Sequence, residues 1–212
     1  MPEVFSMRKA VFAFAFALAF IVALGGTARP ALAATPAEQY IASEVQRGLL
    51  ILNNPQLSKD QRRDQFRNFL LSLTDIKLIA DYTLGQYRRT ATPDELAAYE
   101  AAFKDYGLSV YQSYFNKYSG QTLQVTGSYA LAPDETVVKT LLLDPKDRSQ
   151  KPYEVDFRVL QQGPRYVVID FSAEGVWVRE LERNDFTSFL GQNGGNVALL
   201  TANLKKKSAQ MK

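Results

Sequence analysis

Asp170 and Glu174 are the two side chains of this 212-residue chain whose type and spacing best suit acid–base chemistry. They lie four residues apart beside the end of an expected strand, where one carboxyl could act as a general acid and the other as a general base. The alternative interpretation is structural, with Glu174 capping or pairing where the strand gives way to a helix. The chain has no histidine and no cysteine, which excludes His-based triads, thiol nucleophiles and the usual zinc, haem and iron–sulfur ligands. Glycine-rich phosphate loops and serine-nucleophile motifs are absent from the sequence too, so few catalytic mechanisms remain.

Three basic clusters are the other candidates for a chemical role. They are Arg62-Arg63, Arg88-Arg89 and Lys205-Lys206-Lys207. Such clusters can contact a lipid headgroup or an acidic partner, and they can equally be solvated helix faces. The lysine run also suits a helix C-terminus, where positive charge opposes the helix dipole.

The first 33 residues have the pattern of a cleavable signal peptide. Met7-Arg8-Lys9 is positively charged, and Ala10 to Leu24 is an apolar stretch of 15 residues, shorter than the about 20 residues that a bilayer span needs. Ala31-Leu32-Ala33 has the small-x-small pattern of a cleavage site, which predicts export and cleavage after Ala33. An uncleaved N-terminal anchor is the alternative, and either Met1 or Met7 could be the start.

The charge of the exported part argues against nucleic acid as a partner. Residues 34–212 carry 22 basic and 21 acidic side chains, so the formal charge falls from +3 for the whole chain to +1. Binding to nucleic acid depends on neutralising several phosphates at once, which a near-neutral domain does not favour. Without cysteine, a packed core must stabilise the fold, and one domain of about 179 residues can supply it.

The first half of residues 34–212 has helical periodicity. Capping patterns predict helix starts at Thr35, Ser58, Asp75 and Thr92, and Thr92-Pro93-Asp94-Glu95 is the clearest of them. After it, large side chains recur every three or four positions, which predicts one long amphipathic helix to about Lys117. This aromatic stripe could be ordinary core or the wall of a ligand cavity. Its members are Leu96, Tyr99, Phe103, Tyr106, Val110 and Tyr114.

The second half changes to a period of two and then returns to helix. Alternating apolar and polar residues with short turns between them predict four strands, near 123–129, 136–143, 153–159 and 166–171. Helical segments near 178–190 and 197–207 close the chain. We therefore expect a single α+β domain over 34–212: a helical N-terminal half, a four-stranded antiparallel sheet wrapped on the long amphipathic helix, and closing C-terminal helices. Such a sheet leaves a cone-shaped apolar interior that hosts either a ligand or plain packing.

Three stretches resemble the MlaC family, the toluene-tolerance group of periplasmic phospholipid shuttles. The first runs from Leu84-Gly85-Gln86-Tyr87 to the helix start at Thr92-Pro93, and the second is Gly120-Gln121-Thr122. The most specific runs from Tyr166 through Asp170 to Glu174-Gly175-Val176, with Arg183 and Phe186 matching the next helix. The signal peptide fits as well, so the likeness covers essentially the whole chain.

The resemblance implies a carrier rather than an enzyme, with no cofactor and no metal. Its sheet and helices would enclose an apolar cavity for the acyl chains of a phospholipid, moved through the periplasm between the inner and outer membranes. Its partners would be an inner-membrane ABC transporter with a lipid-binding ring protein and an outer-membrane lipoprotein complex. The expected lipid-binding residues are Phe103, Tyr106 and Val110 on the long helix, Val155, Phe157 and Val159 on the third strand, and Ile169, Phe171 and Trp177 near the mouth. Which face of the fourth strand looks inward stays open, because Val167, Ile169 and Phe171 compete with Tyr166 and Val168.

Departures from the family pattern leave the cargo open. Arg88 replaces a common aromatic, Trp177 replaces the serine usual after Glu-Gly-Val, and the Asn193-Gly194-Gly195 turn resembles the branch associated with hopanoid biosynthesis. A hopanoid or other polycyclic lipid is therefore an alternative cargo. Two rivals remain: a small enzyme with Asp170 or Glu174 as its base, and a ligand-free cell-envelope adaptor with a filled core.

Overall fold

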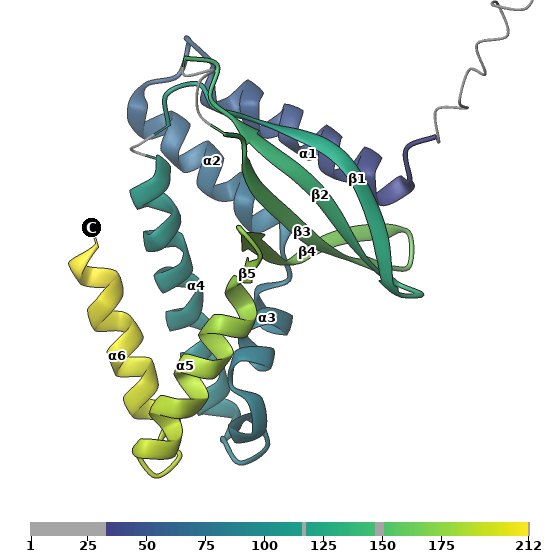
Figure 1. Ribbon diagram of the computed structural model, residues 1–212. Coiled ribbons are helices and arrows are strands. Elements are labelled where there is room, and N and C mark those ends of the chain that lie inside the picture. The colour runs from purple at the N-terminus through teal and green to yellow at the C-terminus, as the bar shows by residue number, and fades with distance from the viewer. Residues whose placement is uncertain (1–32, 116–117, 147–150, 212) are drawn as a thin grey trace, which may run out of the picture. The chain divides into compact units, whose positions relative to one another are not determined.

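The computed structural model describes residues 33–115, 118–146 and 151–211, and residues 34–212 form one compact unit (Figure 1). Apart from Ala33, the predicted signal peptide lies outside the described residues, so its cleavage stays a prediction. Within the described ranges, no helix is both long enough and apolar enough to cross a membrane.

The N-terminal half is helical, as expected, and the predicted capping residues begin its helices. Thr35 and Glu38 form a reciprocal capping box, and so do Ser58 and Gln61. At Thr92, the Glu95 N–H donates to the threonine hydroxyl at 3.2 Å, and the Thr92 N–H donates to the Glu95 carboxylate at 2.9 Å. The elements are α1 (Pro36–Leu52), α2 (Lys59–Leu73), α3 (Ile76–Thr83), the 3-10 helix η1 (Gly85–Arg89) and α4 (Pro93–Phe115).

The strands follow as an antiparallel meander of order β1-β2-β3-β4-β5. The four predicted strands are present, and a fifth of two residues joins them because the chain folds back on β4, pairing Trp177 with Ser172. The strands are β1 (Thr122–Ala132), β2 (Glu135–Leu143), β3 (Tyr153–Gln162), β4 (Arg165–Ala173) and β5 (Val176–Trp177), and the helices α5 (Val178–Gln192) and α6 (Val197–Gln210) follow.

One face of the sheet, the inner face, packs against α1. Ala37 and Ile41 of α1 form a core with Val138, Val159 and Val168 of three neighbouring strands. The opposite, outer face carries Arg158, Asp170 and Ser172 and lies next to α5.

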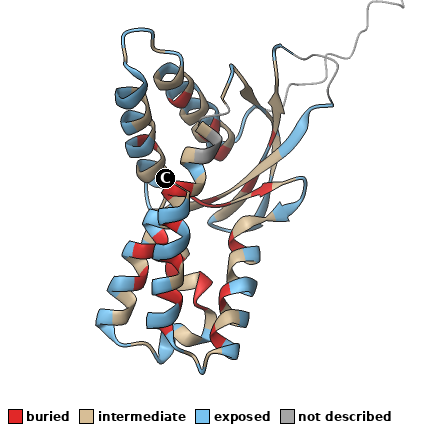
Figure 2. Ribbon diagram, turned by 90° about the vertical axis from the view of Figure 1, so that its left-hand side faces the viewer, coloured by how far each residue is buried: buried red, intermediate tan, exposed pale blue. Residues whose placement is uncertain are grey.

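A second core joins the helices, and it changes the role expected of the long helix. The aromatic stripe of α4 is buried here: Tyr99 and Phe103 both stack edge-on against Phe186 of α5, and Leu200 and Leu204 of α6 complete the cluster. Helices α4 and α6 lie side by side, and Figure 2 shows buried positions on the sides of the helices that face one another. The expectation that the sheet wraps on the long helix is therefore wrong in this detail, because α5 and α6 satisfy the apolar side of α4 and α1 covers the sheet.

Candidate functional site

The inner face of the sheet carries a patch of apolar side chains that the helices only half bury. Val155 and Phe157 of β3 and Phe171 of β4 point to this face, and Phe171 lies opposite Phe157 in the strand register. Further along β3, Val159 is 1% exposed beneath α1. Phe157 packs against the edge of this core, and the inner face is half-buried from Phe157 toward Val155 and Phe171.

A β-bulge decides which residues of β4 belong to the inner face. Val168 pairs with Val159 and Phe171 pairs with Phe157, so β4 has one residue more than β3 in this interval. The extra residue shifts the alternation of side chains. Tyr166, Val168 and Phe171 therefore share the inner face, Asp170 and Ser172 lie on the outer face, and Ile169 is buried at the bulge, 3% exposed.

Aromatic side chains link the helices to one another and to the inner face. Tyr40 of α1 contacts Tyr166 of β4 with ring centroids 5.7 Å apart, and Phe66 of α2 contacts Phe115 of α4 at 6.0 Å. Tyr111 of α4 reaches Phe171 on β4 at 6.1 Å. Helix α4 therefore contacts the half-buried patch through Tyr111, α1 contacts β4 beside it, and α2 contacts α4.

Tyr111 lies beside the patch and is partly exposed. Its side chain is 37% exposed, yet burial raises its pKa above the ordinary value, with Glu182 and Asp170 adding to the effect. Part of the Tyr111 side chain is therefore accessible, whereas its hydroxyl is shielded from water.

A narrow cleft between α2 and α4 leads to Tyr111. Its free volume is about 10 Å³, far below the roughly 300–1,000 Å³ of small-molecule pockets. It is lined by Arg63, Phe66, Arg67, Leu70, Leu108, Tyr111, Gln112 and Phe115. A wider hollow of about 430 Å³ lies at α3, but four of its six lining residues are charged, and it does not suit an acyl chain.

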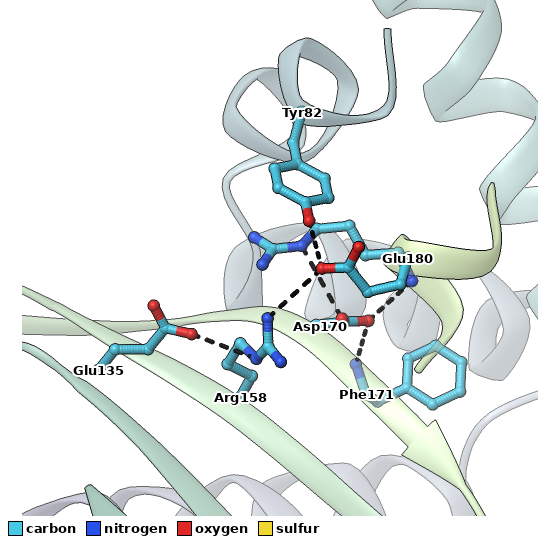
Figure 3. Close-up of polar contacts among 7 residues, drawn as sticks. Tyr82, Glu135, Arg158, Asp170, Phe171 and Glu180 are labelled. Carbon is cyan, nitrogen blue, oxygen red and sulfur yellow. Dashed lines mark hydrogen bonds and ion pairs between the residues drawn. The ribbon is translucent and has the colours of Figure 1, made fainter. Parts of the chain in front are cut away.

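Asp170 is buried on the outer face, where its carboxylate has a structural role rather than that of a general base (Figure 3). One carboxylate oxygen accepts hydrogen bonds from the backbone N–H groups of Phe171 and Arg179, both at 2.8 Å. The other lies 3.8 Å from the Arg179 guanidinium. Burial raises the pKa of Asp170, while the Arg179 N–H and guanidinium oppose that rise. The carboxylate thus fixes the start of α5 against β4.

An ionic cluster around Asp170 extends across the outer face. The Arg158 guanidinium lies 3.2 Å from Glu135 and 3.8 Å from Glu180, and it stacks over the Trp177 ring at 4.7 Å. Glu180 also accepts a hydrogen bond from the Tyr82 hydroxyl of α3 (Figure 3). Glu174 is exposed and accepts the Glu154 N–H of β3 at 2.9 Å. It does not cap α5, whose N-cap is Trp177, so its structural role differs from the expected one. These contacts join α3, α5 and β3, and no metal-holding group of three or more acidic residues occurs in the described part of the chain.

The structure does not bring all the predicted lipid-binding residues together, and they lie in five places. Val155, Phe157 and Phe171 lie together on the inner face, and Val159 lies on the same face within the α1 core. Phe103 is buried in the helical core, with Tyr106 packed against that core. Val110 is half-buried on α4, Ile169 lies in the bulge and Trp177 lies on the outer face under Arg158.

Sequence reasoning missed Phe66, Leu70 and Tyr111 as lining residues. They belong to the expected helices, and Phe66 and Leu70 share an apolar face of the second one, but nothing local indicates that this face meets α4 across a cleft. Glu182 of α5 was missed as well. Burial, with Asp170 and Asp185 nearby, raises its pKa to about 7, which Lys207 partly opposes.

The fold is an α+β domain. The inner face of its antiparallel sheet is partly covered by α1, and the rest of that face carries the half-buried apolar patch. The MlaC protein family model matches residues 43–206. The chain belongs to this family. A phospholipid-binding protein from Ralstonia solanacearum, solved in complex with a phospholipid, has a similar fold: the TM-score is 0.72 at 22% sequence identity, covering 84% of this chain and 99% of that one.

Proposed function

We propose that this protein is a phospholipid carrier that holds acyl chains between the inner face of its sheet and helices α1, α2 and α4. The observation that carries the proposal is the half-buried apolar patch of Val155, Phe157 and Phe171 beneath surrounding helices. Membership of the MlaC family and the fold shared with a phospholipid complex support it.

The energetic need for such a carrier follows from the cost of exposing acyl chains to water. At roughly 0.8 kcal/mol per CH₂, a two-chain lipid with about 30 methylenes faces on the order of 24 kcal/mol in crossing an aqueous space. An apolar interior removes most of this barrier without bond chemistry. Binding therefore needs no catalytic residue, in agreement with the structural role of Asp170.

Loading requires the helices around the patch to move. The cleft between α2 and α4, at about 10 Å³, is too narrow to admit an acyl chain. Across this cleft, Phe66 and Phe115 meet at their rings. Separation of α2 from α4 would expose Tyr111 and, behind it, Phe171.

The setting we infer is the periplasm, with the protein as the soluble component of an ABC transport system. The predicted signal peptide and the family support this setting. The expected partners are the inner-membrane transporter with its lipid-binding ring and an outer-membrane lipoprotein complex. A passive carrier moves lipid down the gradient its partners impose, so its own affinities do not set the direction.

The turn that pointed to a hopanoid has a local structural reason. Gly194 and Gly195 both have positive φ, and a Cβ on Gly195 would lie 3.2 Å from the Tyr87 ring. Positive φ accounts for both glycines, and packing against Tyr87 of η1 is a second reason at Gly195. Since the turn has this local explanation, we propose as cargo a phospholipid, the ligand of the structurally similar protein.

Native mass spectrometry of the protein purified from a periplasmic extract, followed by lipid extraction, tests the proposal. We expect one phospholipid per protein. A polycyclic lipid in its place would support the hopanoid alternative. Protein that is reproducibly empty and takes up no added phospholipid would support the adaptor and contradict the carrier.

A further inference from the structure

Helix α2 places a cationic row beside an apolar row along the cleft. Arg63 and Arg67 are four residues apart, as are Phe66 and Leu70, and all four line the cleft. Residues at this spacing stand on one side of a helix, one turn apart. The opposite wall is contributed by α4 and is largely apolar, and Tyr111 within it also contacts Phe171 of the inner face.

Arg63 and Arg67 have fewer or weaker polar contacts within the protein than Arg47 and Arg62. Arg67 is exposed and forms no ion pair among the described residues. Arg63 lies 2.9 Å from Asp60 and 3.4 Å from Asp64, whose side chains are 77% and 64% exposed, and such surface pairs are weak. No acidic residue lines the cleft itself.

Arg62 and Arg47 are already engaged in the structure. Arg62 donates to the carbonyl oxygens of Asn54 and Leu57 at the start of α2. Arg47 pairs with Glu44, donates to Ser72 and lies over the Phe69 ring. These contacts tie α1, α2 and the loop between them, so both guanidinium groups already have partners within the fold.

We propose that Arg63 and Arg67 bind the phosphate of the lipid headgroup at the mouth of the α2–α4 cleft, which is the route by which acyl chains reach the inner face. This inference rests on the proposed carrier function. A guanidinium fork matches two phosphate oxygens, and the charge-assisted hydrogen bonds are strong. The acyl chains then follow the apolar row past Phe66, Leu70 and Tyr111 toward Phe171. The amphipathic arrangement of α2 matches a phospholipid, polar at one end and apolar along the rest.

The test compares Arg63→Gln/Arg67→Gln with wild type and with Arg165→Gln, a matched control at an exposed arginine that begins β4. Each protein is incubated with vesicles of phosphatidylglycerol and phosphatidylethanolamine and separated from them, and its lipid is counted by native mass spectrometry. We expect phospholipid affinity to fall about tenfold or more for each guanidinium that no longer binds the phosphate, with the control unchanged. Circular dichroism checks that every variant is folded.

A second probe separates the headgroup from the chains. A diacylglycerol with the same acyl chains has no phosphate, so the double variant and wild type should bind it equally. Equal phospholipid uptake by the double variant and wild type would overturn the arginine site and leave the carrier function standing. A variant that keeps its phospholipid but no longer sediments with the vesicles would also overturn it, since the arginines would then bind the membrane surface. Wild-type protein that takes neither lipid would overturn the carrier function and this site together.

Discussion

Asp170 joins the sheet to the helical core through a single buried carboxylate. It accepts hydrogen bonds from the N–H of Phe171 in β4 and from the N–H of Arg179, which the first turn of α5 would otherwise leave without a partner. Its charge also faces the buried Arg179, which lies over the Tyr82 ring at 4.0 Å. The strand-to-helix junction therefore depends on one side chain.

Replacing Asp170 should destabilise the fold strongly. Asp170→Ala leaves the Arg179 charge buried without its partner, so we expect the free energy of unfolding to fall by roughly 3–5 kcal/mol. Urea denaturation followed by circular dichroism measures this. The control, Glu154→Gln at an exposed position on β3, should change it by about 0.5 kcal/mol or less. Equal effects of the two substitutions would contradict the structural role of Asp170.

Glu182 should make stability depend on pH near neutrality. Because its folded pKa of about 7 lies above the ordinary value of 4.5, the folded state holds a proton that the unfolded state has lost between these two values. Stability therefore falls as pH rises from about 4.5 to 7, and the full cost persists above pH 7. We expect Glu182→Gln to raise the free energy of unfolding by roughly 1–3 kcal/mol at pH 8.

Urea midpoints measured from pH 4 to pH 8 check this expectation. At pH 4 the carboxyl is protonated in both states, so the variant and wild type should nearly coincide. A variant that keeps the same loss of stability between pH 4.5 and 7 would show that Glu182 is not the responsible group.

Among the secondary-structure elements, the inner and outer faces of the sheet have different roles. The outer face fixes the sheet to α5 by charged and hydrogen-bonded contacts, whereas the inner face offers apolar surface beneath α1, α2 and α4. The bulge in β4 makes this division possible, because it directs Asp170 outward and Phe171 inward although they are adjacent in sequence.

A charge on the inner face should remove the lipid while the fold survives. Phe157 is half-buried, so Phe157→Asp places a carboxylate where acyl chains would lie, and we expect phospholipid occupancy to fall at least tenfold. Val155→Trp should lower occupancy by filling the same space without adding charge. Lipid extraction and phosphate analysis of the folded proteins measure the effect.

Tyr129 offers the matched control for these variants. It lies on the outer face and is 50% exposed, so Tyr129→Asp should keep full occupancy. Loss of lipid from this variant as well would mean that the inner face has no special part in binding.

The sequence predicted the elements well because their signals are local. The capping residues Thr35, Ser58 and Thr92 and the alternation along β3 each act within a few positions. The pairing of elements depends on distant residues, so the choice of α1 over α4 to cover the sheet could not be inferred. Regular alternation along β3 predicted that Val155 and Phe157 share one face, whereas the face of Phe171 depends on the bulge in β4 and stayed open. The bulge at Ile169, the two-residue β5 and the meeting of α2 with α4 arise from tertiary contacts.

The molecule as a whole has two hydrophobic cores with different roles. The helical core of α3 to α6 is filled by side chains such as Tyr99, Phe103 and Leu204, and it gives a rigid frame. The core beneath α1 fills only part of the inner face, and the rest stays accessible. We propose that a lipid occupies this remainder.

Photo-crosslinking at the inner face measures whether a lipid binds there. Phe157→p-benzoylphenylalanine places a photoreactive group at the patch, and Tyr129→p-benzoylphenylalanine places the same group on the outer face. After loading with phospholipid and irradiation, intact mass spectrometry should show a covalent adduct of one phospholipid for the first protein and none for the second. Lipid-loaded protein that forms the adduct equally at both positions, or only at position 129, would contradict binding at the inner face.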